Sequence, residues 1–420
     1  MRELLAYSTV VLTLGVAIGR PHVGTRWRIG PATAALAGVS VLLTFGIVGP
    51  EDIDAAARTL WRPFITIVAV MLMTGAAGHL GVLDRAAAMI FQRAGLSIRG
   101  LFLSVFVLSA ATASLLNNDA AVLLLTPLVL ALIRKRYPGE RQLLAPFAFV
   151  VFMAAGVAPF VVSNPMNMIV AASAGLNFNR YAQWMAPISL AGWIIAFVIL
   201  RRVFSDALAA DPQPTMLSPT AVGLSRAQRH MLALLLAVLG SYPLVASLDR
   251  SAIWMVSASG AALAVVLAWR EGRIKPRELL VRGVAWDILI FLLAVFVLAI
   301  GLRNVGLVSY LAGVYEDAGI AIVGTVAAIG SALLNNHPMA IMNLLALEST
   351  PGAGEREILA ALIGGDLGPR LLPIGSLAGL LWLESCRRLG VEISLRQFVQ
   401  VGFAVTIPTL AASLLILSFR

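Results

Sequence analysis

Charged residues are scarce in this sequence: Asp, Glu, Lys and Arg supply only 12% of its 420 residues, whereas hydrophobic residues supply 60%. A soluble domain of this length needs considerably more charge to keep its surface hydrated. About ten apolar stretches approach the roughly 20 residues with which a helix crosses a bilayer. The composition therefore excludes an ordinary soluble protein and predicts an all-α polytopic membrane protein.

Cysteine is nearly absent as well. The single Cys386 excludes a disulfide within one chain and any metal site built from three thiolates. The sequence also lacks a His-Glu-x-x-His run, a phosphate-binding loop and a zinc cluster. We therefore expect no metal ion, no cofactor and no enzyme of the classes that these motifs mark.

Basic residues outnumber acidic ones by 31 to 21, but their positions argue against a nucleic-acid partner. Lys and Arg fall in short loops between apolar segments, which is the pattern that orients proteins in membranes. The first residues have no basic n-region and no small-residue cleavage site before Arg20. We expect them to form the first crossing of the bilayer rather than a removed signal.

Two parts of the chain are copies of each other. The matching elements are Trp61 and Trp286, Gly81 and Gly306, and the Leu-Leu-Asn-Asn segments 115–118 and 333–336. The only long polar stretch, 211–229, lies between the copies. The pattern predicts repeat 1 at 1–205, a cytoplasmic linker at 206–229 and repeat 2 at 230–420. Two such repeats are typical of secondary transporters.

Each repeat is predicted to contain five crossings and one re-entrant hairpin. In repeat 1 the crossings are 5–20, 31–48, 61–80, 144–174 and 184–200, and the hairpin is 101–133. In repeat 2 the crossings are 231–244, 252–269, 286–302, 358–384 and 398–417, and the hairpin is 320–347. Because five is an odd number, the second repeat is expected to be inverted relative to the first.

The charges beside each hairpin predict the side from which it enters the membrane. Basic residues, among them Arg99 and Arg134, flank the first hairpin and place its ends in the cytoplasm. Acidic residues, among them Glu316 and Glu348, flank the second hairpin and place its ends outside. With these assignments, both chain termini are expected on the external side of the inner membrane.

Four helix breaks at mid-membrane depth are predicted to form a substrate site. Irregular backbone at this depth is tolerated only in the protein interior or beside a water-filled cavity. The predicted substrate-binding residues are Asn117, Asn118, Ser163, Asn164, Asn167, Asn335, Asn336, Gly375 and Ser376. Amide groups and half-helix N-termini suit a small polar ligand with little or no charge. The alternative is that the asparagine pairs only join helices through hydrogen bonds.

Three ionisable residues near these breaks are candidates for proton coupling, because such groups in a membrane usually mark ion pathways: Asp119, His337 and Asp366. Each has a structural alternative. Asp119 suits a cap on the following half-helix, and His337 suits a neutral imidazole in a polar contact. Asp366 and Arg370 are spaced i, i+4 and suit a simple ion pair.

The motifs resemble those of the ArsB-type arsenite efflux pumps, in the ion transporter superfamily. The similar segments are 116–121 with Thr126-Pro127, 162–167, 335–338, 283–286 with 301–307, and Gly365-Asp366-Leu367-Gly368-Pro369 running to 373–377. The resemblance covers essentially the whole chain, and its C-terminal motif is the most specific part. His337 departs from it, because the family usually carries an apolar residue there, often Met.

The resemblance implies export of As(OH)₃ and Sb(OH)₃ in exchange for protons, and in some organisms a cytoplasmic ATPase partner. The closest alternative is a proton- or sodium-coupled carrier for a small anion such as a dicarboxylate. No Arg or Lys lies at either hairpin tip to balance a carboxylate. An intramembrane aspartyl protease using Asp119 and Asp366 is a further alternative, but residue 363 is Ile where its Gly-x-Gly-Asp motif needs Gly. A channel is also compatible with the sequence.

Overall fold

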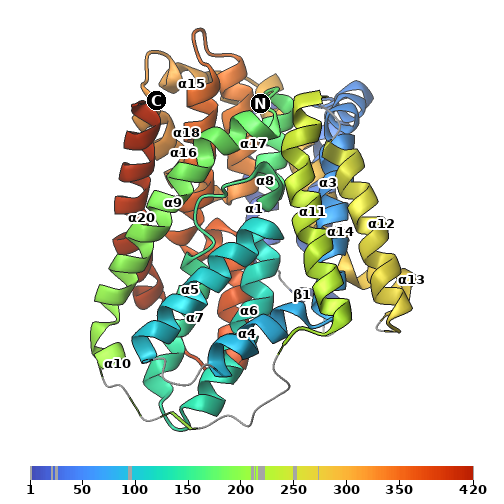
Figure 1. Cartoon of the computed structure of the whole chain (residues 1–420). Helices are drawn as coiled ribbons and strands as arrows, with labels where there is room; N and C mark the ends of the chain where they lie inside the picture. Colours follow the sequence, from blue (N-terminus) through green and yellow to red (C-terminus); the bar gives the residue numbers. More distant parts are fainter. Residues whose placement is uncertain are drawn as a thin grey trace.

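The computed structural model describes residues 2–19, 22–23, 27–92, 97–209, 212, 214–215, 223–248, 253–272 and 274–419. Arg20, where the first crossing was expected to end, and much of the predicted linker (210–211, 213 and 216–222) lie outside the described residues. The described chain is a bundle of helices, and both termini lie at the same end of it (Figure 1).

Helices account for nearly all regular structure in both halves of the chain. The first half contains α1 (Arg2–Gly19), β1 (His22–Val23), β2 (Trp27–Arg28), α2 (Pro31–Thr44), α3 (Pro50–His79), α4 (Val82–Gln92), α5 (Ile98–Leu115), α6 (Asn118–Arg136), η1 (Arg141–Leu143), α7 (Leu144–Met153), η2 (Val161–Ser163), α8 (Pro165–Ser173), α9 (Phe178–Val203) and α10 (Ser205–Ala209). The two short strands pair antiparallel, with His22 opposite Arg28.

The second half follows a closely similar order. It contains α11 (Arg226–Leu248), α12 (Ile253–Arg270), α13 (Pro276–Gly283), α14 (Trp286–Asn304), α15 (Leu307–Tyr315), α16 (Ile320–Leu334), α17 (Asn336–Glu348), α18 (Glu355–Leu367), η3 (Gly368–Arg370), η4 (Pro373–Gly375), α19 (Leu377–Arg388) and α20 (Leu395–Ser418).

Seven helices of the described chain are long and apolar enough to cross a membrane: α3, α5, α9, α11, α12, α14 and α20. All but α5 are predicted crossings, and α5 is one arm of a hairpin. The other predicted crossings are α1, the 14-residue α2 and two interrupted helices, α7–α8 and α18–α19. The chain is thus an all-α polytopic membrane protein, as the composition predicted.

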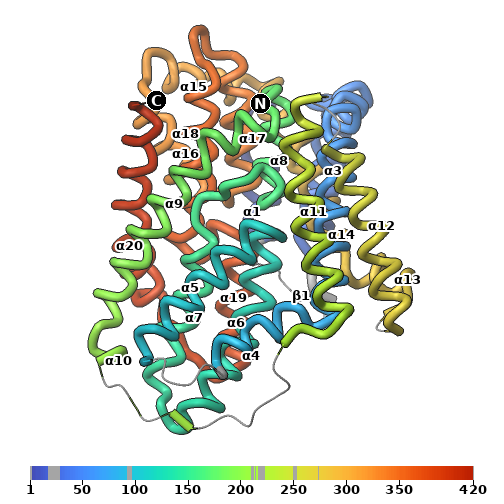
Figure 2. The backbone as a smooth tube through the Cα atoms, in the orientation of Figure 1, coloured from blue at the N-terminus to red at the C-terminus, as the bar shows by residue number. Residues whose placement is uncertain are grey.

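Both helical hairpins are present, and they lie in opposite halves of the molecule (Figure 1). The arms α5 and α6 occupy the lower half, and α16 and α17 the upper half. The interrupted helices cross between them: α19 packs against α6 in the lower half, and α8 packs against α17 in the upper half (Figure 2). The breaks therefore lie in the middle of the molecule.

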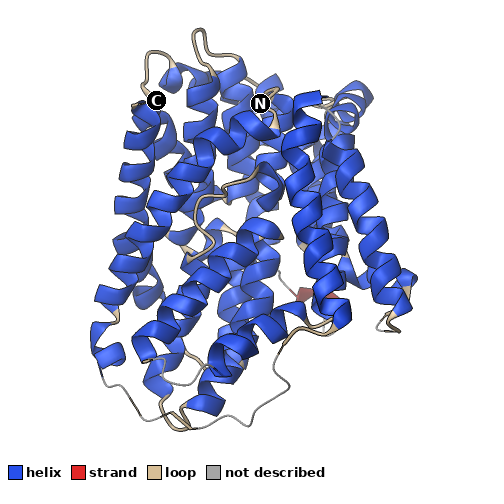
Figure 3. Ribbon diagram, viewed as in Figure 1, coloured by secondary structure: helices blue, strands red, loops and turns tan. Residues whose placement is uncertain are grey.

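Four helices begin at these breaks, namely α6, α8, α17 and α19, and each has a polar cap. The caps are Asn117, Asn164, Asn335 and Ser376, whose side chains accept hydrogen bonds from main-chain N–H groups of the first turn. Figure 3 shows non-helical segments within the helical body. A main-chain N–H group without a hydrogen-bond partner costs several kcal/mol at membrane depth. The sequence must therefore supply a capping side chain wherever a helix begins within the membrane.

The glycine that occurs at the matching position of both repeats is explained by its backbone conformation. Gly81 and Gly306 have φ values of 69° and 88°, in the left-handed region where a side chain is strained. Each lies at a sharp turn from a crossing helix into a short helix, α4 or α15. These two short helices are not among the predicted segments. The crossing α3 is also longer than predicted, because it begins at Pro50 rather than Trp61.

Candidate functional site

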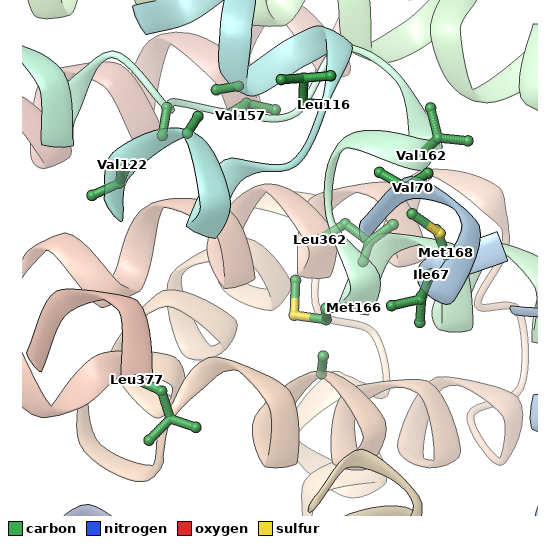
Figure 4. Close-up of a cluster of buried hydrophobic side chains, with 14 of the residues drawn as sticks. Ile67, Val70, Leu116, Val122, Val157, Val162, Met166, Met168, Leu362 and Leu377 are labelled. Carbon is green, nitrogen blue, oxygen red and sulfur yellow. The ribbon is translucent and has the colours of Figure 1, made fainter. Parts of the chain in front are cut away.

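A small cavity of about 40 Å³ lies where the breaks meet. Its polar lining comes from four elements and from the caps of two more: Asn118 and Asp119 on α6, Asn336 on α17, Asp366 on α18, Arg370 on η3, and the caps Asn164 of α8 and Ser376 of α19. Buried apolar side chains such as Val122, Met166, Leu362 and Leu377 surround the breaks (Figure 4). In such dry surroundings each polar contact is stronger than in water, and each unmet one is costlier.

The two asparagines of each hairpin tip have different tasks. The first is a cap: Asn117 Oδ1 accepts from the N–H groups of Asp119 and Ala120 at 3.0 and 3.1 Å. Asn335 Oδ1 likewise lies 3.4 Å from the N–H of His337. The second asparagine of each pair lines the cavity, and the Oδ1 atoms of Asn118 and Asn336 are buried without a hydrogen-bond partner.

Asp366 joins the two interrupted helices. Its carboxylate accepts hydrogen bonds from the N–H of Ala158 at 2.9 Å, from Asn164 Nδ2 at 2.8 Å and from Asn167 Nδ2 at 3.0 Å. Asn167 Nδ2 also lies 2.7 Å from the hydroxyl of Tyr181, which contacts the carbonyl oxygen of Ala158 at 3.1 Å. The Asp366 carboxylate is therefore saturated by donors from the first half of the chain.

The ion pair suggested by the i, i+4 spacing of Asp366 and Arg370 takes another form. Arg370 donates to the main-chain carbonyl oxygens of Asp366 and Gly156, at 2.6 and 3.2 Å, rather than to the Asp366 carboxylate. Its side chain is 5% exposed, and its Nε has no partner. Helix α18 ends at Leu367, so Arg370 lies on the 3-10 turn η3 and not on the helix face that the spacing assumed.

Asp119 lies between the small cavity and a larger one of about 550 Å³, and it lines both. The larger cavity, which we call the vestibule, is lined by α3, α4, α6 and the junction of α13 with α14. Its lining is mainly apolar, with His79, Asp84 and Arg282 as its other ionisable residues. Within the described part of the chain, no side chain forms an ion pair with Asp119 or donates a hydrogen bond to its carboxylate.

Six predicted site residues do not line the small cavity: the caps Asn117 and Asn335, Asn167 beside Asp366, and Ser163, Gly375 and His337. Ser163 Oγ donates to the carbonyl oxygen of Ser114 at 2.7 Å and so fastens η2 to the end of α5. Gly375 is a packing position, because a Cβ atom there would lie 2.6 Å from the Cα of Pro369. His337 is buried with its ring edge towards Phe291, and its Nε2 has no partner.

Sequence reasoning left Tyr181 out of the site, and it named Arg370 among the ionisable residues inside the membrane but favoured a structural pair with Asp366. Arg370 carried a usable signal, since a basic residue inside an apolar segment is rare, but an ion pair seemed to account for it. Tyr181 carried none, because its contact with Asn167 depends on how α9 packs beside α8. The lone Cys386 is fully buried on α19 and does not line the small cavity or the vestibule.

Comparison with known proteins supports the resemblance seen in the motifs. The model of the family described as "Arsenical pump membrane protein" matches residues 5–419. The "Arsenical pump membrane protein" of Escherichia coli K12 is 32% identical over 99% of both chains. A "Putative arsenical pump membrane protein" of Bacillus subtilis is 26% identical over 94% of this chain and 96% of its own. A "46 kDa membrane protein" of Mycobacterium leprae is 26% identical over 91% of this chain and 92% of its own. The chain therefore belongs to the arsenical pump membrane protein family.

Proposed function

We propose that this protein exports trivalent metalloids, as the neutral trihydroxides As(OH)₃ and Sb(OH)₃, in exchange for protons. Family membership supports the transport of arsenicals. The observation that carries the choice of ligand is the pair of buried, unpartnered Oδ1 atoms of Asn118 and Asn336, one from each hairpin, on one small cavity. Buried acceptors without partners are rare in proteins, and a ligand with hydroxyl groups satisfies them.

The charges around the cavity favour a neutral ligand over an anion. Arg370 lines the cavity, so the absence of basic residues at the hairpin tips does not describe the whole site. Two carboxylates, Asp119 and Asp366, face this single guanidinium. An anionic substrate would add a further negative charge to a site that already has no positive excess, which is costly in a buried setting. We therefore regard transport of a small anion, such as a dicarboxylate, as the second candidate function.

Proton coupling is assigned to Asp119. An ionised Asp119 can accept a hydrogen bond from a substrate hydroxyl, whereas a protonated one has lost much of that capacity. Substrate and proton then compete for one site, as an exchanger requires. Asp366 already accepts three hydrogen bonds from the first half of the chain, so we assign it a positioning role instead. His337 lies behind the tip and away from the cavity lining, and it is not needed in this scheme.

Alternating access follows from the proposed inverted relation of repeats 1–205 and 230–420. The vestibule lies between α3 and α6, whereas the corresponding helices α14 and α17 pack closely. If the two repeats exchanged these arrangements, α3 and α6 would close the vestibule, and α14 and α17 would separate to open a path on the other face. We assign the vestibule to the cytoplasmic side because Arg85 and Arg282 belong to predicted cytoplasmic loops. The protein is then an inner-membrane exporter with both termini outside.

Arsenite uptake into everted membrane vesicles, with an acidic interior and no added ATP, tests the proposal. We expect wild-type protein to accumulate arsenite, and an uncoupler to abolish the accumulation. Asp119→Asn should lose this coupled accumulation. The matched control is Asp84→Asn, which removes an exposed carboxylate from the vestibule and should behave as wild type. Omitting ATP separates intrinsic exchange from any contribution of a cytoplasmic ATPase. Failure of correctly inserted wild-type protein to accumulate arsenite would refute the proposed exchange.

A further inference from the structure

Arg370 is a buried polar side chain on the small cavity to which the proposed transport cycle does not yet assign a role. Two of its three nitrogens donate to main-chain carbonyl oxygens, and the third, Nε, is buried without a partner. The residue lines the same small cavity as Asn118, Asp119 and Asn336. A buried N–H donor without an acceptor loses a hydrogen bond that it would make in water, so a ligand oxygen in the cavity would restore it.

The way in which Arg370 is held gives its guanidinium a fixed position. The two carbonyl oxygens belong to Asp366 on α18 and to Gly156 in the segment between α7 and η2, so both interrupted helices hold it. Neither acceptor carries a charge. Within the described chain, the guanidinium therefore forms no direct ion pair with a carboxylate. Its positive charge acts on the groups that line the cavity.

The ionisable groups around Asp119 come from several elements. Asp366 and Arg370 share the small cavity with it, and His79, Asp84 and Arg282 share the vestibule. His337 follows Asn336 on α17 but does not line either cavity. Arg370 is thus the only basic residue of the described chain on the small cavity, which it shares with two carboxylates.

We propose that Arg370 has two linked roles in the exchange cycle: its free Nε–H donates to an oxygen of the bound trihydroxide, and its charge offsets that of Asp366. With Asp366 offset, Asp119 can release its proton on the cytoplasmic side and so become an acceptor for substrate. The inference rests on the proposed metalloid–proton exchange and adds a specific substrate contact and a determinant of the working pH.

Two substitutions separate the roles. Arg370→Lys keeps the charge but cannot reproduce the fixed Nε–H donor, so we expect the KM for arsenite to rise roughly tenfold or more while the pH dependence stays near that of wild type. Arg370→Gln removes the charge as well. It leaves the Asp366 carboxylate uncompensated beside Asp119, so Asp119 should hold its proton to higher pH. The pH of half-maximal uptake should then rise by about one to two units.

The chain offers a matched control in Arg136, at the end of α6. Arg136 is also buried, also donates to a main-chain carbonyl, that of Phe91, and also has an unpartnered Nε, but it does not line either cavity. Arg136→Gln should lower the amount or stability of the protein without moving the KM or the pH midpoint. Uptake rates are compared per inserted protein, and thermal unfolding in detergent is followed in parallel.

The outcomes distinguish the two proposals. If wild-type vesicles accumulate no arsenite, the exchange itself is wrong. If wild type is active and a folded Arg370→Gln protein keeps both its KM and its pH midpoint, the exchange stands and the role of Arg370 is refuted. If Arg370→Gln does not insert, Arg370→Lys alone decides the substrate contact through its KM. A change in protein amount alone, equal in the Arg136 and Arg370 variants, would leave Arg370 as a purely structural residue.

Discussion

Replacing Asn118 or Asn336 with alanine should weaken arsenite binding and leave the fold nearly unchanged. Among the residues that the structure describes, the Oδ1 atom of each side chain has no partner, so its removal breaks no hydrogen bond seen at that atom. What the substitution removes is the proposed contact with the substrate. This separates the second asparagine of each tip from the first, whose side chain caps a helix.

The size of the effect follows from one neutral hydrogen bond at each position. Such a bond contributes a net of about 0.5–1.5 kcal/mol, which corresponds to a rise in the KM for arsenite of roughly 2-fold to 12-fold. The two residues belong to different hairpins, so in the proposed complex they would contact the ligand independently. Their effects should therefore multiply, to about 30-fold in the double variant if each contributes about 1 kcal/mol.

The assay is the initial rate of arsenite uptake into everted vesicles over a range of concentrations, normalised to inserted protein. Asn343→Ala is the matched control, because Asn343 is also a buried asparagine on α17, its Oδ1 accepts from the Tyr315 hydroxyl at 2.7 Å, and it does not line the small cavity. The Asn343→Ala substitution should change the stability of the protein but not its KM for arsenite. An unchanged KM in both single variants, or an equal rise in the Asn343 variant, would refute the site.

Three further substitutions test the structural roles of neighbouring residues. Asn117→Ala removes a cap with two hydrogen bonds and should destabilise the protein by about 1 kcal/mol, seen as a lower unfolding midpoint in detergent, with less than a twofold change in KM. Ser163→Ala loses the bond to Ser114 and should likewise lower the midpoint by a similar free energy; a large rise in KM would instead make Ser163 a ligand contact. Gly375→Ala places a Cβ atom 2.6 Å from the Cα of Pro369, so we expect little monodisperse protein on gel filtration, and a normal yield would contradict this packing role.

Much of the fold was predictable because the membrane restricts what the chain can do. Long apolar segments must be helices at bilayer depth, and polar residues in the middle of such a segment mark the places where helices restart. The breaks at Asn117, Asn164, Asn335 and Ser376 were therefore found from the sequence. The start of α3 was missed because Glu51 and Asp52 looked like loop residues, whereas Asp52 bonds to the N–H of Gly49 and forms part of the first helical turn.

The details of the site were less predictable, because they depend on contacts between segments about 200 residues apart. The sequence indicates that Asn164, Asn167 and Asp366 are polar residues in apolar surroundings, but not that both amides donate to that one carboxylate. Local spacing favoured an ion pair for Arg370, whereas the end of α18 at Leu367 turns the side chain towards Gly156. The different tasks of paired asparagines also follow only from the geometry of each turn.

The burial of Cys386 has a consequence for the survival of the protein in the presence of its proposed cargo. Trivalent arsenic damages proteins by bonding to accessible sulfur, and an exporter meets more of it than most proteins in the cell. Here the only sulfhydryl group of the chain is enclosed on α19, with none of its surface exposed. The thiol is therefore shielded from the proposed cargo, and we expect Cys386 to remain unmodified by arsenite during repeated turnover.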